Sequence, residues 1–425
     1  MMTYELPQVA PPPHVPPQEQ ADAHIVELIG LDGAEALLDS HRLSALLGRE
    51  VLITHLRIKP RHSLVVAFRE AGPRRTGASC SGYGWITITD DADKFTKALQ
   101  RASKVGETLT VLRDESPWII SGSVWADPVL AKDVADMRSA LGGRPVEVLR
   151  YNPRRRLVAA VGEGETRKVI RVVPGAGERL LSIQEQWRSA EVPVTRARPL
   201  GQRGSATIVP LWGYGDLVHH PHAPAAETAG AALAQLHART TLPCGAGTEP
   251  ADSAQPPGGV LPVDPQTPAH AVALYAPWLE RRSARLSELL TERLTEVGTG
   301  SIVRLHGDLS PDQVILAAEG SHKIRFIDLE RSGMGEALRD LGSWVAACRR
   351  MDLPHLVDPF LEGYARASGQ CVSALRRSAA SRSWEAYAHL SASLDSFRHR
   401  ERDWPQAVTR AIELAEEALS DAREP

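Results

Sequence analysis

Short apolar runs and alternating apolar and polar positions dominate the chain between residues 50 and 212. The segments EVLITHLRIKP and SLVVAFRE are rich in β-branched residues and meet at a Pro-Arg-His turn, which is the pattern of a β-hairpin. A similar phrase returns later: LRIKPR begins at Leu56 and LRYNPR begins at Leu149, and an apolar run follows each. Because a short helical segment ending in glycine precedes both phrases, we interpret them as two copies of one hairpin unit.

The second copy continues into elements that complete a small α+β lobe. ETRKVIRVVP predicts a third strand, ERLLSIQEQWRSA has its apolar residues at helical spacing, and SATIVPLW predicts another strand. Helical patterns then extend over 225–239, over 269–296 and from residue 337 to the C-terminus. The segment 244–268 is rich in proline and glycine, which predicts a long surface loop or linker.

Composition narrows the class of protein without defining its chemistry. A chain of 425 residues with 43% hydrophobic residues is long enough for two or three domains. The 49 Lys and Arg residues balance the 52 Asp and Glu residues, so no overall field favours nucleic acid or an anionic membrane. The four cysteines form no CxxC pair, and the N-terminus lacks the features of a signal peptide. We therefore expect a soluble cytoplasmic protein that binds neither nucleic acid nor membrane, and the sequence gives no oligomeric state.

One short passage carries the candidate chemistry. In LHGDLSPDQVIL, a polar loop that contains Asp308 and Gln313 lies between two apolar strands, and in IRFIDLERSG, Asp328 directly follows another apolar strand. Carboxylate and amide oxygens at the ends of neighbouring strands are suitable ligands for Mg²⁺. Aspartate is also common in ordinary turns. The two strand-end carboxylates in this order favour a functional site.

These residues resemble the core of the aminoglycoside phosphotransferase and choline kinase-like family, which shares the bilobal protein kinase fold. The matching positions are His306, Gly307, Asp308, Gln313, Asp328, Gly335 and the pair Asp340-Leu341. The resemblance spans roughly residues 144–420. It implies an α+β fold with a small β-rich lobe and a mostly helical lobe, here with an additional N-terminal α+β region.

On this resemblance the chain divides into four parts. They are a disordered Pro-rich leader (1–22), a cap or degenerate repeat of the small lobe (23–140), a kinase-like small lobe (141–213) and a helical lobe with the catalytic loop (214–425).

The resemblance also implies a role for each matching residue. Asp308 would orient the acceptor hydroxyl or receive its proton, and Gln313 and Asp328 would hold Mg²⁺ on the phosphates of ATP. His306 would brace the loop. Asp340 would support the same loop from its helix, although an acidic residue in a first helical turn is also ordinary capping.

Three further residues are expected at the nucleotide. The backbone near Trp212 would receive the adenine edge, although a tryptophan there can equally be a packing residue. Arg171 stands where the family has a phosphate-contacting lysine, and Lys168 lies three residues earlier on the opposite face of the strand. Glu185 in the following helix would pair with Arg171.

Two other features differ from the family pattern. Gln313 replaces the usual asparagine, as in the maltokinase-like branch, and keeps the same carbonyl ligand on a longer stem. No GxGxxG is present; the turn Gly162-Glu163-Gly164 is acidic, whereas the turn at Pro153-Arg154 could bring Arg154 or Arg155 to a phosphate.

The sequence thus predicts ATP- and Mg²⁺-dependent phosphorylation of a hydroxyl group on a small molecule such as an aminoglycoside or a sugar. A pseudokinase that assists a partner enzyme, with a peptide as one substrate class, is the alternative, and Arg171 in place of lysine supports it. A metal-dependent hydrolase that uses His306, Asp308 and Asp328 is a third reading.

Overall fold

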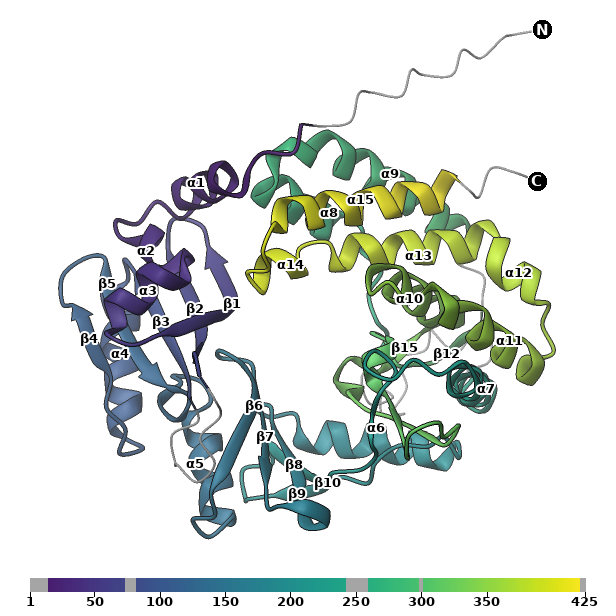
Figure 1. Ribbon diagram of the computed structural model, residues 1–425, viewed down its shortest axis with the longest axis horizontal. Helices are drawn as coiled ribbons and strands as arrows, with labels where there is room; N and C mark the ends of the chain where they lie inside the picture. The colour runs from purple at the N-terminus through teal and green to yellow at the C-terminus, as the bar shows by residue number, and fades with distance from the viewer. Residues whose placement is uncertain (1–13, 73–81, 242–258, 298–300, 421–425) are drawn as a thin grey trace, which may run out of the picture.

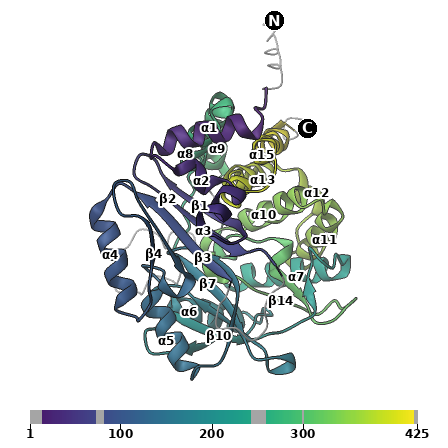
Figure 2. The ribbon, with the colours of Figure 1, turned by 60° about the vertical axis from the view of Figure 1, so that its left-hand side comes forward.

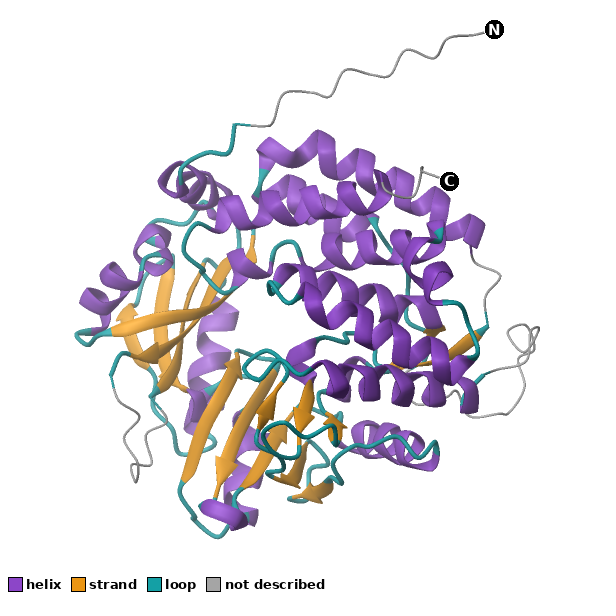
Figure 3. Ribbon diagram, turned by 45° about the vertical axis from the view of Figure 1, so that its right-hand side comes forward, coloured by secondary structure: helices purple, strands orange, loops and turns teal. Residues whose placement is uncertain are grey.

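Two five-stranded antiparallel sheets lie on one side of the molecule and most of the helices lie on the other (Figure 3). The computed structural model describes residues 14–72, 82–241, 259–297 and 301–420. This arrangement confirms the predicted α+β fold with a small β-rich lobe, a helical lobe and an additional N-terminal region. The predicted domain boundaries remain predictions.

The first sheet belongs to the N-terminal region and has the strand order β1-β2-β3-β5-β4. Its strands are β1 (Val51–Lys59), β2 (Ser63–Glu70), β3 (Tyr83–Thr89), β4 (Thr110–Arg113) and β5 (Trp118–Ser123). The helices around it are α1 (Gln18–Ile29), α2 (Ala34–Leu38), α3 (Ser40–Leu47) and α4 (Ala92–Ser103), whereas α5 (Ala131–Ala140) contacts the second sheet. Figure 2 shows α4 on the outer side of this sheet.

The second sheet repeats this order as β6-β7-β8-β10-β9. Its strands are β6 (Val146–Asn152), β7 (Arg156–Val161), β8 (Lys168–Val172), β9 (Arg198–Leu200) and β10 (Ala206–Pro210). Helix α6 (Gly177–Ser189) follows the third strand here, just as α4 follows β3 in the first sheet. The structural repeat predicted from the two hairpins is therefore confirmed and extends over five strands and a helix.

The two copies differ at the position of Arg171. Arg171 in β8 lies opposite Val158 in β7, and the corresponding pair in the first sheet is Thr87 opposite Val65. Thr87 is buried and donates its hydroxyl to the carbonyl of Leu64. The first sheet therefore has no cation at the position where the second has its arginine.

A buried carboxylate joins the end of the first copy to the hairpin turn of the second. Asp127 accepts the hydroxyl of Tyr151 at 2.6 Å and the backbone amide of Arg154 at 2.7 Å through the same oxygen. Apolar residues from both sheets and from α4 and α5 also form one core. The turn at Arg154 is thereby held in place from outside its own sheet.

The rest of the chain is mostly helical. Its helices are α7 (Ala223–Arg239), α8 (Gln266–Tyr275), α9 (Glu280–Val297), α10 (Ala337–Arg350), α11 (Val357–Ser368), α12 (Val372–Arg377), α13 (Ala379–Ala392), α14 (Asp395–Arg398) and α15 (Trp404–Ser420). Its short strands are β11 (Gly215–Asp216), β12 (Ile302–Leu305), β13 (Val314–Leu316), β14 (Ile324–Phe326) and β15 (Gly333–Glu336).

The last helices return to the N-terminal region, as the labels α14, α15 and α1 in Figure 1 show. Arg400 binds both oxygens of Asp22 at 2.7 and 2.8 Å, and the indole of Trp404 donates to the same carboxylate. Asp22 lies in α1, which begins at Gln18, so the predicted disordered leader to residue 22 is wrong for residues 18–22. Burial of Ile25 and other apolar residues one helical turn apart explains this helix. Residues 1–13 of that leader lie outside the described residues.

Helices α7 and α11 approach so closely that their contact requires glycine. A Cβ on Gly363 would collide with the backbone carbonyl of Glu227, and one on Gly230 would collide with that of Phe360. Backbone atoms of two packed helices cannot move aside cheaply.

We expect Gly363→Ala to lower the free energy of unfolding by about 1–3 kcal/mol, because the cost of overpacking exceeds the gain in helix propensity. Denaturant unfolding measures the change. Glu362→Ala is the control, since Glu362 is an exposed neighbour in the same helix and should change stability by less than about 0.5 kcal/mol. Equal stability of Gly363→Ala and wild type would contradict the close packing.

Candidate functional site

The β13–β14 hairpin brings Gln313 and Asp328 together. Val314 pairs with Phe326 in this hairpin, and the amide of Ile327 donates to the carbonyl of Gln313 at 3.0 Å. The residue before one strand therefore lies beside the residue that follows the other. The local register thus produces the neighbourhood that the sequence predicted.

The loop that leads to Asp308 is fixed by a buried carboxylate from α10. Asp340 accepts the backbone amide of His306 at 2.7 Å and that of Gly307 at 2.8 Å, one on each oxygen. The Nε2 atom of His237 lies 3.5 Å from the carboxylate of Asp340. Burial would raise the pKa of Asp340, but His237, His306 and the Gly307 amide outweigh it and lower that pKa.

The shape of this loop depends on glycine and histidine. Gly307 has φ of 84°, and a Cβ there would collide with the carbonyl of Arg331. The fully buried His306 directs Nε2 to the carbonyl oxygen of Ile327 at 2.9 Å. Its ring also lies edge-on to Trp187, with the ring centres 5.7 Å apart. His306 thus links the loop of Asp308 to the strand end that carries Asp328.

Asp308 extends from this loop toward solvent. Its side chain is 49% exposed, and one oxygen lies 3.1 Å from a guanidinium nitrogen of Arg331. Partial enclosure raises the pKa of Asp308, and the positive charge of Arg331 opposes that rise. A carboxylate that is accessible and more basic than usual is suited to receive a proton.

Gln313 is buried and lacks a partner where a metal ligand was predicted. Its side-chain oxygen is shielded from solvent and accepts no hydrogen bond within the described part of the chain. A buried amide oxygen without a partner is costly. The side-chain oxygen of Gln313 is therefore suited to coordinate a metal ion, as predicted for this residue.

Asp328 lies in a cluster of four charged side chains between the sheet lobe and the helical lobe. Arg171 contacts Asp328 at 2.6 Å and Glu330 at 2.8 Å, and Arg156 contacts them at 3.5 and 2.9 Å. Burial alone would raise the pKa of Asp328, but the two guanidinium groups outweigh it and lower that pKa to about 2. Asp328 also has φ of 61° and ψ of 46°, a left-handed conformation that aspartate tolerates.

The structure corrects one predicted contact and adds two residues. Glu185 does not pair with Arg171; it is exposed and binds Arg188 at 2.8 Å. Glu330 occupies the expected place beside Arg171, because the chain turns back after Asp328. Arg156 was also missed, although it begins β7 directly after the Pro-Arg turn that drew attention to its two predecessors.

The other predicted nucleotide residues lie apart from this cluster. Lys168 is exposed at the start of β8, on the face opposite Arg171. Trp212 follows β10 and is partly buried, with the guanidinium of Arg325 lying 4.3 Å from its ring centre. Its predicted place beside adenine remains a prediction.

The donor chemistry suits Mg²⁺ when phosphate oxygens complete the site. Among the described residues, no three His, Cys, Asp or Glu side chains lie together as a metal cage. Gln313 and Asp328 offer hard oxygen ligands, and Mg²⁺ is usually bound by one or two carboxylates together with substrate phosphates. Both oxygens of Asp328 are now bound to arginines, so the ion would have to displace or share these contacts.

Residues 193–390 match the model of the phosphotransferase enzyme family APH. The matched segment contains Asp308, Gln313, Asp328 and Asp340, and the resemblance predicted from the sequence is confirmed. No curated protein matches the chain by sequence. Within the described residues, no helix has the length and apolar character needed to cross a membrane.

Solved structures of similar fold include several phosphotransferases. One is a thermostable mutant of aminoglycoside phosphotransferase APH(4)-Ia with ADP and hygromycin B (TM-score 0.48, 15% identity, 68% of this chain and 98% of that chain). Another is a choline/ethanolamine kinase family protein from Mesorhizobium loti (0.46, 14%, 68% and 97%). A third is APH(3'')-Id from Streptomyces rimosus with ADP and streptomycin (0.44, 17%, 62% and 98%).

We expect Asp340→Asn to lower the free energy of unfolding by about 1–3 kcal/mol at pH 7. The asparagine side chain has a single acceptor oxygen, so it can accept only one of the two loop N–H groups, and its NH₂ group then faces the other. The folded-state pKa of Asp340 is lowered, so its stabilisation is complete above about pH 4 and is lost as the pH falls further. The difference between variant and wild type should therefore shrink in acid.

Denaturant unfolding at several pH values measures this difference. Asp352→Asn is the control, because it makes the same substitution at an exposed residue. Equal stability of Asp340→Asn and wild type at pH 7 would show that the carboxylate does not hold the loop.

Proposed function

We propose that this protein transfers the γ-phosphoryl group of ATP to a hydroxyl group of a small molecule in a Mg²⁺-dependent reaction. The main support is the unpartnered buried oxygen of Gln313 beside Asp328, at the end of the loop that presents Asp308. The match to the phosphotransferase family over the same residues supports the reaction class. Four scattered cysteines without a CxxC motif fit a cytoplasmic enzyme.

Each residue of the site has a task in this reaction. Asp308 is accessible and more basic than usual, so it orients the acceptor hydroxyl and receives its proton as the oxygen bonds to phosphorus and ADP leaves. Arg171 extends from β8 to Asp328 and Glu330, where its guanidinium can also bind phosphate oxygens. Glu330 holds Arg171 in this orientation.

Gln313 and Asp328 would hold Mg²⁺. The ion, when bound, neutralises negative charge on the phosphates of ATP. The lowered pKa of Asp328 keeps this ligand ionised at neutral pH. The space between the lobes thereby has an anionic ligand for the metal next to a cationic one for the phosphates.

A pseudokinase is the alternative, and one observation favours it. Arg171 and Arg156 both pair with Asp328, so this carboxylate has a structural role between the lobes as well as the proposed role of metal ligand. Such a protein would keep the lobes together as a binding or scaffold module beside a partner enzyme. Nucleotide binding that depends on Mg²⁺ distinguishes the two functions.

We expect wild-type protein to bind ATP more tightly with Mg²⁺ than without it, and Asp328→Asn to lose most of this difference. Asp308→Asn should bind MgATP like wild type but lower the rate of phosphoryl transfer by about 10²–10⁴-fold, because the proton acceptor is gone. Calorimetric titration measures binding, and ADP release with a panel of hydroxyl compounds measures transfer.

The exposed Asp352→Asn serves again as the matched control and should behave as wild type in both assays. Unchanged MgATP binding in Asp328→Asn would show that the metal site is wrong. No ATP binding by the wild type at any Mg²⁺ concentration would favour the scaffold.

A further inference from the structure

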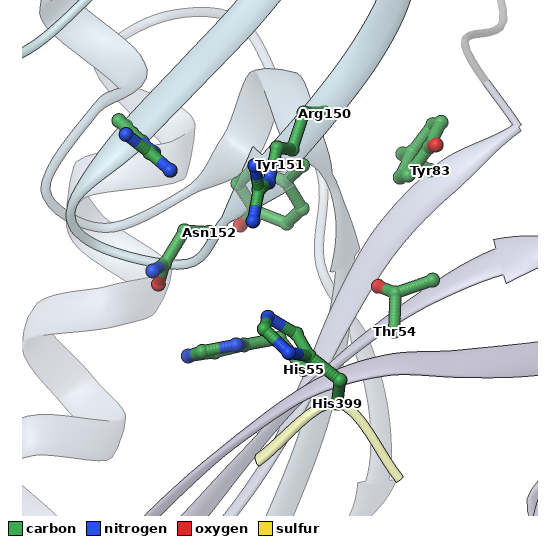
Figure 4. A pocket seen from close by; sticks show the side chains of 8 residues that line it. Thr54, His55, Tyr83, Arg150, Tyr151, Asn152 and His399 are labelled. Carbon is green, nitrogen blue, oxygen red and sulfur yellow. The ribbon is translucent and has the colours of Figure 1, made fainter. Parts of the chain in front are cut away.

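A cavity of about 180 Å³ lies where three parts of the chain meet. Thr54 and His55 from β1 form one wall, Arg150 and Asn152 from β6 form the opposite wall, and His399 after α14 closes one side (Figure 4). The cavity is large enough for several water molecules. It therefore has room for a tetrahedral oxyanion.

The lining is strongly basic. Arg150 and Arg156 line the cavity directly, and the charges of Arg155 and Arg398 also act on His55. Within the described residues, no carboxylate pairs with Arg150 or Arg155, whereas Arg398 binds Asp395 and Arg156 binds Glu330. The cavity thus has more positive than negative charge.

Two histidines also line the cavity. The rings of His55 and His399 lie with their centres 5.5 Å apart. Burial, the neighbouring His399 and the arginines 398, 150 and 155 lower the pKa of His55 to about 3. His55 is therefore neutral at pH 7 and can donate an N–H to an anion without adding a further charge.

Two polar groups of the lining lack partners. The hydroxyl of Thr54 and the side-chain oxygen of Asn152 are shielded from solvent and make no hydrogen bond to any described residue. The hydroxyls of Tyr83 and Tyr151 are already used, by the carbonyl of Leu149 and by Asp127. The unsatisfied groups on both walls offer a donor for an anion and an acceptor for a hydroxyl proton on the ligand.

We propose that this cavity is a binding site for a phosphate-type oxyanion, held by Arg150, the Thr54 hydroxyl and the imidazole of His55. The N-terminal sheet supplies two of these three groups. It therefore completes a ligand site that the second sheet cannot form alone.

The cavity adjoins the candidate active site through one residue. Arg156 lines the cavity and also lies 3.5 Å from Asp328. If the proposed phosphotransferase function holds, the oxyanion is a charged group of the acceptor, which places the acceptor class among phosphorylated hydroxyl compounds. Free inorganic phosphate offers the same chemistry without that function.

Calorimetric titration with inorganic phosphate tests the site without ATP, at pH 7 and with the ionic strength fixed by NaCl. We expect saturable binding by the wild type and at least about tenfold weaker binding by Arg150→Gln, because a charge-assisted hydrogen bond is lost. Arg144→Gln is the matched control: Arg144 is exposed just before β6, outside the cavity. It should bind phosphate as the wild type does.

Thr54→Val tests the contribution of the N-terminal sheet. Its shape is nearly unchanged, and the lost hydroxyl has no partner in the free protein, so stability should not fall. Phosphate binding should weaken. Reduced binding with unimpaired stability separates a ligand contact from a structural role.

Titration with glucose 6-phosphate and with glucose distinguishes a phosphorylated acceptor from free inorganic phosphate as the source of the anion. Tighter binding of glucose 6-phosphate than of inorganic phosphate supports a phosphorylated acceptor, and the reverse order supports free phosphate; both retain the site. Absence of saturable phosphate binding by the wild type, or equal losses in Arg150→Gln and Arg144→Gln, would overturn the proposal.

The proposed function can fail separately. Phosphate binding without any ATP binding would retain the cavity site and reject the kinase. If Arg150→Gln instead lost ATP and phosphate affinity in parallel, the cavity would belong to the nucleotide site, and the separate oxyanion site would be rejected.

Discussion

The contacts of Arg171 and Arg156 with Asp328 and Glu330 are the interaction on which the site depends. All four side chains are between 17% and 21% exposed, so each charge has lost much of its hydration and needs a partner of opposite sign. The arginines come from the second sheet and the carboxylates from the loop after β14. The cluster therefore sets the position of the sheet lobe relative to the helical lobe.

Around this cluster the site combines a rigid part with an exchangeable part. Asp340 and His306 hold the loop through hydrogen bonds to backbone groups, so the position of Asp308 is fixed by the fold. The charge pairs of Asp328 are side-chain contacts, and under the proposed function Mg²⁺ or phosphate would replace them while the backbone contacts stay in place.

The N-terminal sheet illustrates how a repeated unit acquires a different task. It has the strand order of the second sheet but has Thr87 in place of Arg171, so it lacks the cation that we propose for the nucleotide phosphates. Its contacts are with its neighbours instead: Asp127 holds the hairpin turn of the second sheet, and Asp22 binds the returning C-terminal segment. These contacts hold β1 in place, and β1 forms one wall of the cavity beside the candidate active site.

The sequence predicted the features that arise within a few residues of one another. The polar loop, the strand before Asp328 and the two hairpins are local patterns, and the spacing from Gln313 to Asp328 is that of a single hairpin, so their neighbourhood followed from the register. The partner of Arg171 could not be found in this way, because Glu185 and Glu330 are both plausible by spacing and the turn after Asp328 decides between them. The cavity at Arg150 could not be predicted from the sequence either. Its lining residues Thr54, Asn152 and His399 come from three distant segments, which are adjacent because the C-terminal helices return to α1.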